Sequence, residues 1–258
     1  MILLLDIGNT HTHLGLANKT KVTRQTDFAT GAWVGKSAEK HLAAFAGRSE
    51  IEGVAFCSVV PDVTSLVRPM VKRLWALSVL ELTSKTIRGV GINYPRPESI
   101  GADRLANAVA VKALFGAPAV VVDFGTAVTF DVIDKRGDYV GGIIAPGLAA
   151  MTDYLHEKTA LLPKIKIREV QAVIGKNTEQ AMLIGAVHGY RGLIRELLSE
   201  LKGELDSSRL PVVATGGYAA LIASKLPEIT AVKPLLTLEG LRLVWKAHRK
   251  SQPKSVER

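Results

Sequence analysis

Two short stretches of the sequence combine a carboxylate, a glycine and a hydroxyl in the same order. The first is Asp6-Ile7-Gly8-Asn9-Thr10 and the second is Asp123-Phe124-Gly125-Thr126-Ala127. A carboxylate at a strand end can hold hydrated Mg²⁺, glycine lets the backbone approach phosphate, and amides and hydroxyls donate hydrogen bonds. Either stretch alone could equally be an ordinary hairpin turn. Two such turns facing each other would grip a triphosphate, so their repetition predicts a nucleotide site.

Two further motifs add groups that such a site would need. Thr215-Gly216-Gly217-Tyr218 follows an apolar run, and its paired glycines would let a flat nucleoside lie against the backbone. Gly101-Ala102-Asp103-Arg104 places a carboxylate beside a guanidinium where a helix is expected to begin, a place that favours anions. The plainer interpretations are a strand-to-helix turn and an exposed Asp-Arg pair, and the residues alone leave both open.

Alternating apolar runs and helical patterns predict the elements that carry these motifs, and they are typical of an α/β protein. Strands are expected over 2–6, 13–17, 22–26, 54–57, 79–82, 119–123 and 211–214. Helical spacing covers 34–46, 63–75 with Pro61 near its start, 102–115, 179–201 and a helix from about Ala219. A loop over 84–99 and a solvated tail over 250–258 complete the expected layout.

The second half of the chain repeats the first. Asp6 and Asp123 both end apolar strands and lie 117 residues apart, and the runs over 54–58 and 212–216 form a second, weaker pair. We therefore expect a duplicated domain, with residues 1–117 forming one half and 118–258 the other. Nucleotide is expected in the cleft between them, since ligand sites often lie between domains.

Composition narrows the class of protein. The chain has 258 residues, 47% of them hydrophobic, which is enough for a sizeable core. Its one cysteine, Cys57, excludes an intrachain disulfide, and no apolar run approaches a membrane span, so a cytoplasmic location is expected. The net charge of +9 suits anionic ligands, while the scattered cations and few aromatics argue against direct nucleic-acid binding.

Six motifs in this order resemble type III pantothenate kinases over nearly the whole chain. They are Asp6 to Thr10, Ser58-Val59-Val60-Pro61, Gly101 to Arg104, Asp123 to Ala127, Gly141-Gly142-Ile143-Ile144-Ala145-Pro146-Gly147 and Thr215-Gly216-Gly217. One motif alone would be weak evidence, but six in this order are specific, because Gly-Ala-Asp-Arg and Gly-Gly-x-Ile-x-Pro-Gly separate this family from other actin-like sugar and acetate kinases. The resemblance implies an actin-like, ribonuclease H-like α/β fold of two duplicated domains, with mixed sheets flanked by helices.

The same resemblance implies roles for individual residues. The positions that match ATP-binding ones are Asp6, Ile7, Gly8, Asn9, Thr10, His11, Thr12, His13 and Thr126. Those that match pantothenate-contacting ones are Tyr94, Gly101, Ala102, Asp103, Arg104 and Thr178. Asp103 matches the proton acceptor, Asp123 matches the residue that holds a monovalent cation, and Asp6 is expected near Mg²⁺.

The implied activity is phosphorylation of pantothenate by ATP, with Mg²⁺, K⁺ (or NH₄⁺) and a homodimeric assembly, for which the helical pattern over 179–201 has apolar residues to spare. Alternatives are a nucleotide-binding regulator of the same fold without turnover and a kinase for another hydroxy acid; the presence of Asp6, Asp103 and Asp123 argues against the regulator. Departures from the family pattern are His11 and His13, which we interpret as incidental and solvent-facing, together with Val128 and Cys57. Cys57 stands where serine is common and is expected to be a buried, inert thiol.

Overall fold

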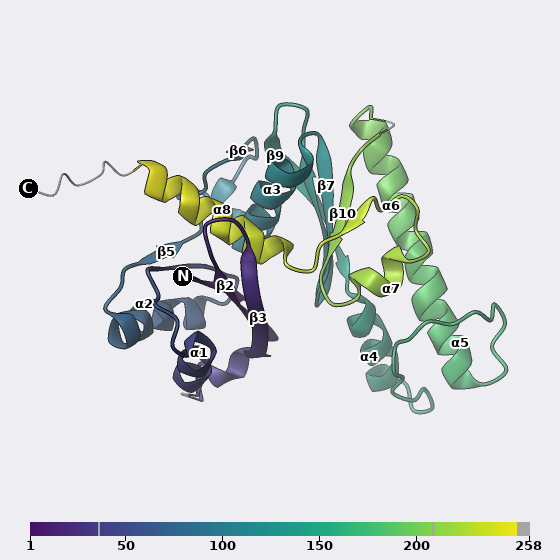
Figure 1. Cartoon of the computed structure of the whole chain (residues 1–258). Helices are drawn as coiled ribbons and strands as arrows, with labels where there is room; N and C mark the ends of the chain where they lie inside the picture. The colour runs from purple at the N-terminus through teal and green to yellow at the C-terminus, as the bar shows by residue number, and fades with distance from the viewer. Residues whose placement is uncertain (36, 208, 252–258) are drawn as a thin grey trace, which may run out of the picture. The chain divides into compact units, whose positions relative to one another are not determined.

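The computed structural model describes residues 1–35, 37–207 and 209–251. The chain forms two compact units, which are described separately: residues 1–114 with the stretch from 235 onward, and residues 115–234 (Figure 1). The expected break at residues 117 and 118 lies near the change of unit after residue 114. The C-terminal helix differs from the expected division, because it groups with the first unit rather than the second.

The first unit is built on a five-stranded sheet in the order β3-β2-β1-β4-β5. Its strands are β1 (Ile2–Ile7), β2 (His11–Ala17), β3 (Val22–Ala29), β4 (Gly53–Ser58) and β5 (Val79–Glu81). β1, β2 and β3 form an antiparallel meander, whereas β4 and β5 run parallel to β1. The aliphatic run Ile2 to Leu5 is almost fully buried, so β1 is the centre of this sheet.

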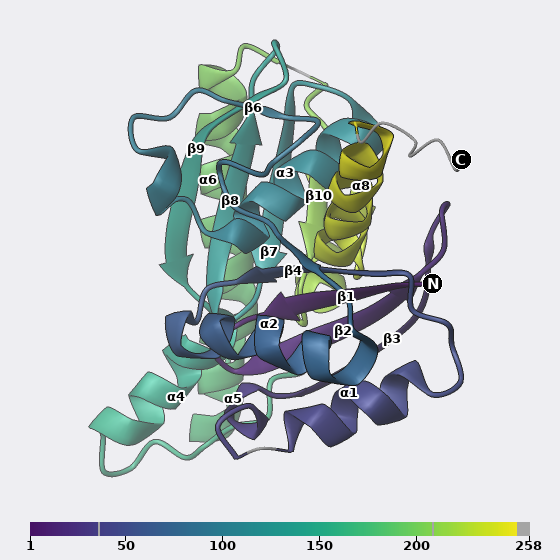
Figure 2. The same cartoon turned by 90° about the vertical axis from the view of Figure 1, so that its left-hand side faces the viewer.

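Helices cover both faces of this sheet. α1 (Ala38–Ala46) and α2 (Pro61–Trp75) pack their apolar faces on one side, in a core that includes Leu3, Leu5 and Phe56 (Figure 2). α2 begins at Pro61, whose fixed φ suits the first helical position, as the sequence indicates. The unit also contains η1 (Thr30–Ala32), β6 (Gly91–Ile92), η2 (Pro97–Ser99), α3 (Ala102–Phe115) and α8 (Leu236–Ser251).

Glycines let α8 approach the sheet and α3 closely, which explains why α8 belongs to the first unit. A Cβ on Gly53 would lie 2.6 Å from the ring of Trp245, and one on Gly15 would lie 3.2 Å from Leu238. A Cβ on Gly240 would lie 2.0 Å from the backbone oxygen of Ala106, so only glycine allows the helices to meet this way. The absence of a side chain at these three glycines thus allows α8 to pack closely on α3 and on the second face of the sheet.

The second unit repeats this arrangement. Its strands are β7 (Ala119–Phe124), β8 (Ala127–Ile133), β9 (Asp138–Pro146), β10 (Val212–Thr215) and β11 (Ala231–Val232), paired in the order β11-β10-β7-β8-β9. Again three strands form an antiparallel meander and two run parallel to its first strand. The equal strand order confirms the duplication expected from the motifs, with β7 equivalent to β1 and β10 to β4.

The helices of the second unit are α4 (Leu148–Lys158), α5 (Thr178–Ile184), α6 (Tyr190–Glu204) and α7 (Ala219–Ala223). The π-helical turn η3 (Gly185–Gly189) joins α5 to α6. α6 buries Tyr190, Ile194 and Leu198 against the apolar side chains of β7, β8 and β10. A single helical pattern over 179–201 therefore proves to be two α-helices joined by a π turn.

Several expected bounds shift in the structure. The helix expected over 34–46 begins only at Ala38, and the strands expected over 13–17 and 22–26 are longer, starting at His11 and ending at Ala29. The loop over 84–99 contains β6 and η2. Lys250 and Ser251 belong to α8 rather than to a tail, and residues 252–258 lie outside the described residues.

Candidate active site

The carboxylate of Asp6 lies at the carboxyl end of β1, in a row of side chains that crosses three strands. The strand register places Asp6 opposite Cys57 of β4 and opposite His13 of β2. Residues that are directly opposite in register share one face of a sheet. The Cys57 thiol donates a hydrogen bond to Asp6 Oδ1 at 3.3 Å. This row lies on the face opposite the α1 and α2 core, since Leu5 and Ile7 point into that core.

The surroundings of Asp6 shift its protonation equilibrium toward the neutral form. Burial, and to a lesser extent repulsion from the nearby Asp103 carboxylate, raise its pKa to about 7, while the Cys57 hydrogen bond acts in the opposite direction. The Cys57 thiol is fully buried, and burial together with Asp6 raises its pKa well above the ordinary value. Cys57 is therefore a protonated hydrogen-bond donor and not a nucleophile.

Asp103 is brought toward Asp6 by the start of α3. Its Oδ1 accepts a hydrogen bond from the backbone N–H of Arg104 at 2.8 Å, and the helix dipole favours an acidic side chain in the first turn. Burial raises the pKa of Asp103, and the contacts with Arg104 oppose that rise. Gly101 leaves the Asp103 carboxylate its place, because a Cβ at position 101 would lie 2.5 Å from Asp103 Oδ1 and would displace it. The Gly-Ala-Asp-Arg motif thus holds one carboxylate beside another.

The turn between β1 and β2 presents backbone and polar side chains. Gly8 N–H bonds to the carbonyl of His11 at 3.0 Å, and the Thr30 hydroxyl donates to the carbonyl of Gly8 at 2.7 Å. The exposed side chains here are Asn9, Thr10, His11 and His13. The rings of His11 and His13 lie 6.4 Å apart, on the same face of the sheet as Asp6. Hydrogen-bonding groups therefore surround the strand end that carries Asp6.

Two expected ATP-binding positions point away from this turn. Ile7 is fully buried in the α1 and α2 core. Thr12 is also fully buried, and its hydroxyl accepts a hydrogen bond from Trp33 Nε1 at 3.0 Å and lies 3.1 Å from the Thr30 hydroxyl. Their side chains lie in the interior and support the turn, so these two residues can offer a ligand only backbone atoms.

The second unit builds an equivalent row around Asp123. The register places Asp123 opposite Thr129 of β8 and Thr215 of β10. Gly216 has a φ of +89°, and a Cβ there would lie 2.6 Å from Asp123 Oδ1, so glycine is needed for both conformation and space. Thr126 is exposed in the turn between β7 and β8. The threonine-glycine-glycine motif thus packs directly against the candidate cation ligand.

Other predicted contacts with pantothenate lie in different places of the chain. Tyr94 is an exposed loop residue of the first unit, between β6 and η2. Thr178 is the exposed first residue of α5 in the second unit. Its helix is capped by Asn177, whose side chain accepts a hydrogen bond from the N–H of Gln180 at 2.8 Å. Gly101, Ala102 and Arg104 accompany Asp103 at the start of α3.

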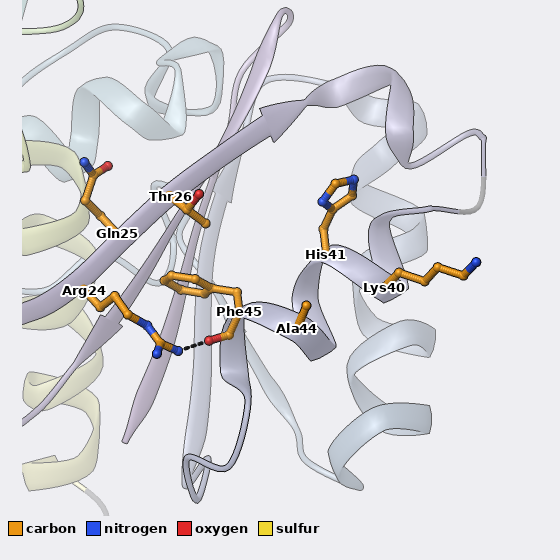
Figure 3. Close-up of a pocket in the computed structure, with 7 residues that line it drawn as sticks. All are labelled: Arg24, Gln25, Thr26, Lys40, His41, Ala44 and Phe45. Atoms are coloured by element: carbon orange, nitrogen blue, oxygen red, sulfur yellow. Dashed lines mark hydrogen bonds between the residues drawn. The ribbon is translucent and has the colours of Figure 1, made fainter.

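A surface pocket of the first unit lies apart from these residues. Figure 3 shows it between β3 and α1, with a volume of about 620 Å³. Its lining consists of Arg24, Gln25, Thr26, Lys40, His41, Ala44 and Phe45. The guanidinium of Arg24 reaches both the ring and the backbone oxygen of Phe45. None of the predicted site residues lines it, so it is not the phosphate site.

The described residues contain no cluster of three or more His, Cys, Asp or Glu side chains arranged to hold a metal ion. Mg²⁺ in kinases commonly uses one or two carboxylates, with water and substrate phosphates as its other ligands. Asp6 suits such a site, because a divalent cation would relieve the repulsion between its carboxylate and that of Asp103. Within the described part of the chain, no helix has the length and apolar character to cross a membrane.

Cys57 is the site neighbour whose contact the sequence did not reveal. A fully buried cysteine normally behaves as a small apolar residue, and it was expected to be inert packing. Its hydrogen bond to Asp6 follows from the parallel register of β1 and β4. The usable signal was that both residues end strands of the same predicted sheet.

Comparison with known proteins identifies the family. A model of the type III pantothenate kinase family matches residues 2–200. A type III pantothenate kinase of Akkermansia muciniphila is 48% identical over 242 residues, covering 93% of this chain and 96% of the relative. One of Methylacidiphilum infernorum is 42% identical over 245 residues, covering 94% and 87%.

Solved structures agree on the fold. A Sinorhizobium meliloti protein described as a candidate 2-dehydro-3-deoxygalactonokinase has a TM-score of 0.58 at 12% identity, over the full length of both chains. At that identity the match shows the fold alone, and it confirms the expected actin-like kinase architecture. The family match over most of the sequence, with both aspartate-bearing strand ends in place, leads to one conclusion: this chain belongs to the type III pantothenate kinase family.

Proposed function

We propose that this chain transfers the γ-phosphoryl group of ATP to the primary hydroxyl of pantothenate, giving ADP and 4′-phosphopantothenate, the first step of coenzyme A synthesis. The observation that carries the proposal is the pair of carboxylates in the first unit, Asp6 and Asp103, in a member of this kinase family. Phosphoryl transfer needs positioned charge and an acceptor for the hydroxyl proton, and this pair divides those two tasks.

Asp103 is assigned as the proton acceptor. Burial raises its pKa, which makes the carboxylate a stronger base than an exposed aspartate. The bond from the Arg104 N–H keeps one oxygen fixed at the start of α3, so the other oxygen is available to the hydroxyl. The Arg104 guanidinium is assigned to the carboxylate of pantothenate, with Tyr94, Gly101, Ala102 and Thr178 as further contacts.

The turn from Asp6 to His13, together with Thr126, is assigned to ATP. Asn9 and Thr10 offer exposed donors at the strand end, and Gly8 leaves the backbone uncovered there. Asp6 would hold Mg²⁺, because a divalent cation would relieve the repulsion between the carboxylates of Asp6 and Asp103. When bound, Mg²⁺ neutralises phosphate charge. Asp6 interacts electrostatically with Asp103, so a cation held at Asp6 would lie near the assigned proton acceptor.

Asp123 is assigned to a monovalent cation, K⁺ or NH₄⁺. Its carboxylate lies at the end of β7, and the glycine at position 216 leaves room beside Oδ1 that any side chain would fill. Hard cations take oxygen ligands, and this strand-end carboxylate supplies them. These features support the assignment, and the response of the enzyme to K⁺ tests it.

We further propose that the enzyme is a cytoplasmic homodimer. The sequence suggested the helical stretch 179–201 as the dimer surface, but α6 buries its apolar residues within its own unit. Five of the large exposed apolar side chains of the second unit belong instead to α4 and the segment that follows it in the chain. They are Tyr154, Leu155, Leu161, Val173 and Ile174, and Leu161 is 89% exposed. Such a set favours burial against a second copy.

A coupled ADP-release assay tests the proposed activity. The purified chain is incubated with ATP and Mg²⁺, with and without pantothenate, first in K⁺ and then in Na⁺. We expect ADP release that depends on pantothenate and is faster in K⁺. Release without pantothenate would indicate a plain ATPase, and no release in either salt would favour a nucleotide-binding regulator.

A further inference from the structure

The segment of residues 159–177 in the second unit has no helix or strand, yet it leads directly into Thr178 at the start of α5. A long irregular segment is held in place only by specific contacts. The contacts of this one come from α5, η3 and the first turn of α6, which follow one another in the chain.

The strongest of these contacts is an ion pair between a buried arginine and a partly exposed glutamate. Arg191 donates from Nη1 and Nη2 to the two carboxylate oxygens of Glu169, at 3.1 and 2.6 Å. The Arg191 side chain is only 7% exposed, and it also donates to the backbone oxygens of Leu221 and Ile222. A bidentate pair with this much support fixes both position and orientation. Arg191 therefore ties the segment to α7 and α6 at once.

Neighbouring contacts hold the segment on both sides of Glu169. His188, which lies in the π turn, donates from Nε2 to the carbonyl of Val170 at 2.9 Å. The Val170 side chain is buried with Leu183 and Val187, and Ile165 and Ile167 pack against this cluster. π turns often occur at functional positions, and this one turns His188 toward the segment that Arg191 also holds.

The last residues of the segment contact α5, which begins at Thr178, so the position of the segment fixes that of Thr178. Gly175 packs so closely on α5 that a Cβ would lie 2.5 Å from the backbone N of Ala181. The N–H of Lys176 donates to the Gln180 side chain at 2.8 Å, and the N–H of Gln180 donates to Asn177. These reciprocal bonds form a helix cap of the capping-box kind. The segment and the start of α5 thus behave as one connected piece.

We propose that Arg191 is a positioning residue for pantothenate binding: through Glu169 it fixes residues 159–177 and thereby sets the location of Thr178. This inference rests on the proposed function, which assigns Thr178 to pantothenate. Arg191 and Glu169 do not touch substrate in this account. Their effect is confined to the substrate that Thr178 contacts and does not extend to ATP.

The test uses Glu169→Gln, which keeps the size of the side chain and removes the charge that Arg191 needs. Glu169 is 34% exposed, so the variant is expected to fold. The matched control is Glu228→Gln, because Glu228 accepts a hydrogen bond from Arg195 at 3.0 Å, one turn further along α6, without contacting the segment. Hydrogen–deuterium exchange of peptides covering 163–177 reports the position of the segment independently of catalysis.

For Glu169→Gln we expect faster exchange over 163–177 and a KM for pantothenate raised roughly three- to tenfold, with kcat and the KM for ATP within about twofold of the wild type. Arg191→Lys keeps the positive charge but cannot form two parallel hydrogen bonds. Its exchange rate and its KM for pantothenate should lie between those of the wild type and Glu169→Gln. An unchanged KM for pantothenate, an equal rise in the KM for ATP, or the same rise in Glu228→Gln would overturn the inference. Failure of the proposed function is distinguishable, because the wild type itself would then not phosphorylate pantothenate.

Discussion

The thiol of Cys57 donates to the carboxylate of Asp6 across two parallel strands, at a distance of 3.3 Å. The equivalent row of the second unit places Thr215 opposite Asp123. The duplicated fold therefore puts a hydrogen-bonding residue beside the strand-end aspartate in both units. In the first unit that residue is a thiol, which is a weaker donor than a hydroxyl.

The first prediction follows from this thiol. Cys57→Ser supplies a stronger donor to the ionised carboxylate, and should therefore lower the pKa of Asp6 from its value of about 7. Because the account needs ionised Asp6, the acidic limb of the kcat/KM profile should move to lower pH by roughly half a unit. Cys57→Ala removes the donor and should move that limb to higher pH. Identical acidic limbs in all three proteins would show that this contact does not tune Asp6.

A second prediction separates the two glycines of the threonine-glycine-glycine motif. Gly216→Ala should disturb the Asp123 carboxylate, because its Cβ would meet Oδ1 at 2.6 Å and its φ of +89° is strained for alanine. We expect ATP use to fall by roughly tenfold or more and the stimulation by K⁺ to weaken. Gly217→Ala is the control, since its Cβ would have no neighbour within 4 Å. Equal activity and K⁺ response in the two variants would remove Asp123 from the cation site.

A third prediction concerns assembly. Light scattering of the wild type should give twice the chain mass of 27.7 kDa. Ile174→Lys places a charge among the exposed apolar residues after α4 and should weaken the dimer by at least roughly tenfold in Kd. Val34→Lys, at a similarly exposed apolar position of the first unit, should leave it intact. A fully active monomer at micromolar concentration would refute the proposed dimer.

The fourth prediction tests the assigned base. Asp103→Asn keeps the shape of the side chain and its bond from Arg104 N–H, but it cannot take a proton. Turnover should fall by roughly 10²–10⁴-fold, while the Kd for ATP stays within about twofold. A drop below about threefold would mean that another group accepts the proton. Parallel loss of ATP binding would instead place Asp103 in the nucleotide site.

The sequence predicts the architecture of each unit well, because the repeated strand ends at Asp6 and Asp123 reflect a real duplication. Apolar periodicity also gives α2 and α3 nearly to the residue. Apolar periodicity does not predict the local backbone geometry where tertiary contacts determine it. The π turn at Gly185–Gly189 continues the helical pattern of α5 and α6, so periodicity cannot distinguish it from one helix.

The site is predictable in its chemistry but less so in its local geometry. The motifs identify Asp6 and Asp103 as candidate site residues. The pKa of each is raised mainly by burial, however, and burial cannot be read from the spacing of the motifs. Thr12 has the residue type of a phosphate donor, but strand alternation turns its side chain into the core, where the hydroxyl bonds with Trp33 and Thr30. Grouping α8 with the first unit depends on helix contacts at glycines, a signal that a single sequence does not display.

The central claim is that this chain phosphorylates pantothenate, and mass spectrometry of the product tests it most directly. Purified protein is mixed with pantothenate and ATP that carries ¹⁸O in its γ-phosphate, in the presence of Mg²⁺ and K⁺. The account predicts 4′-phosphopantothenate that contains the labelled phosphoryl group, formed in equal amounts with ADP by the wild type and nearly absent with Asp103→Asn. Labelled inorganic phosphate with unmodified pantothenate would contradict the account.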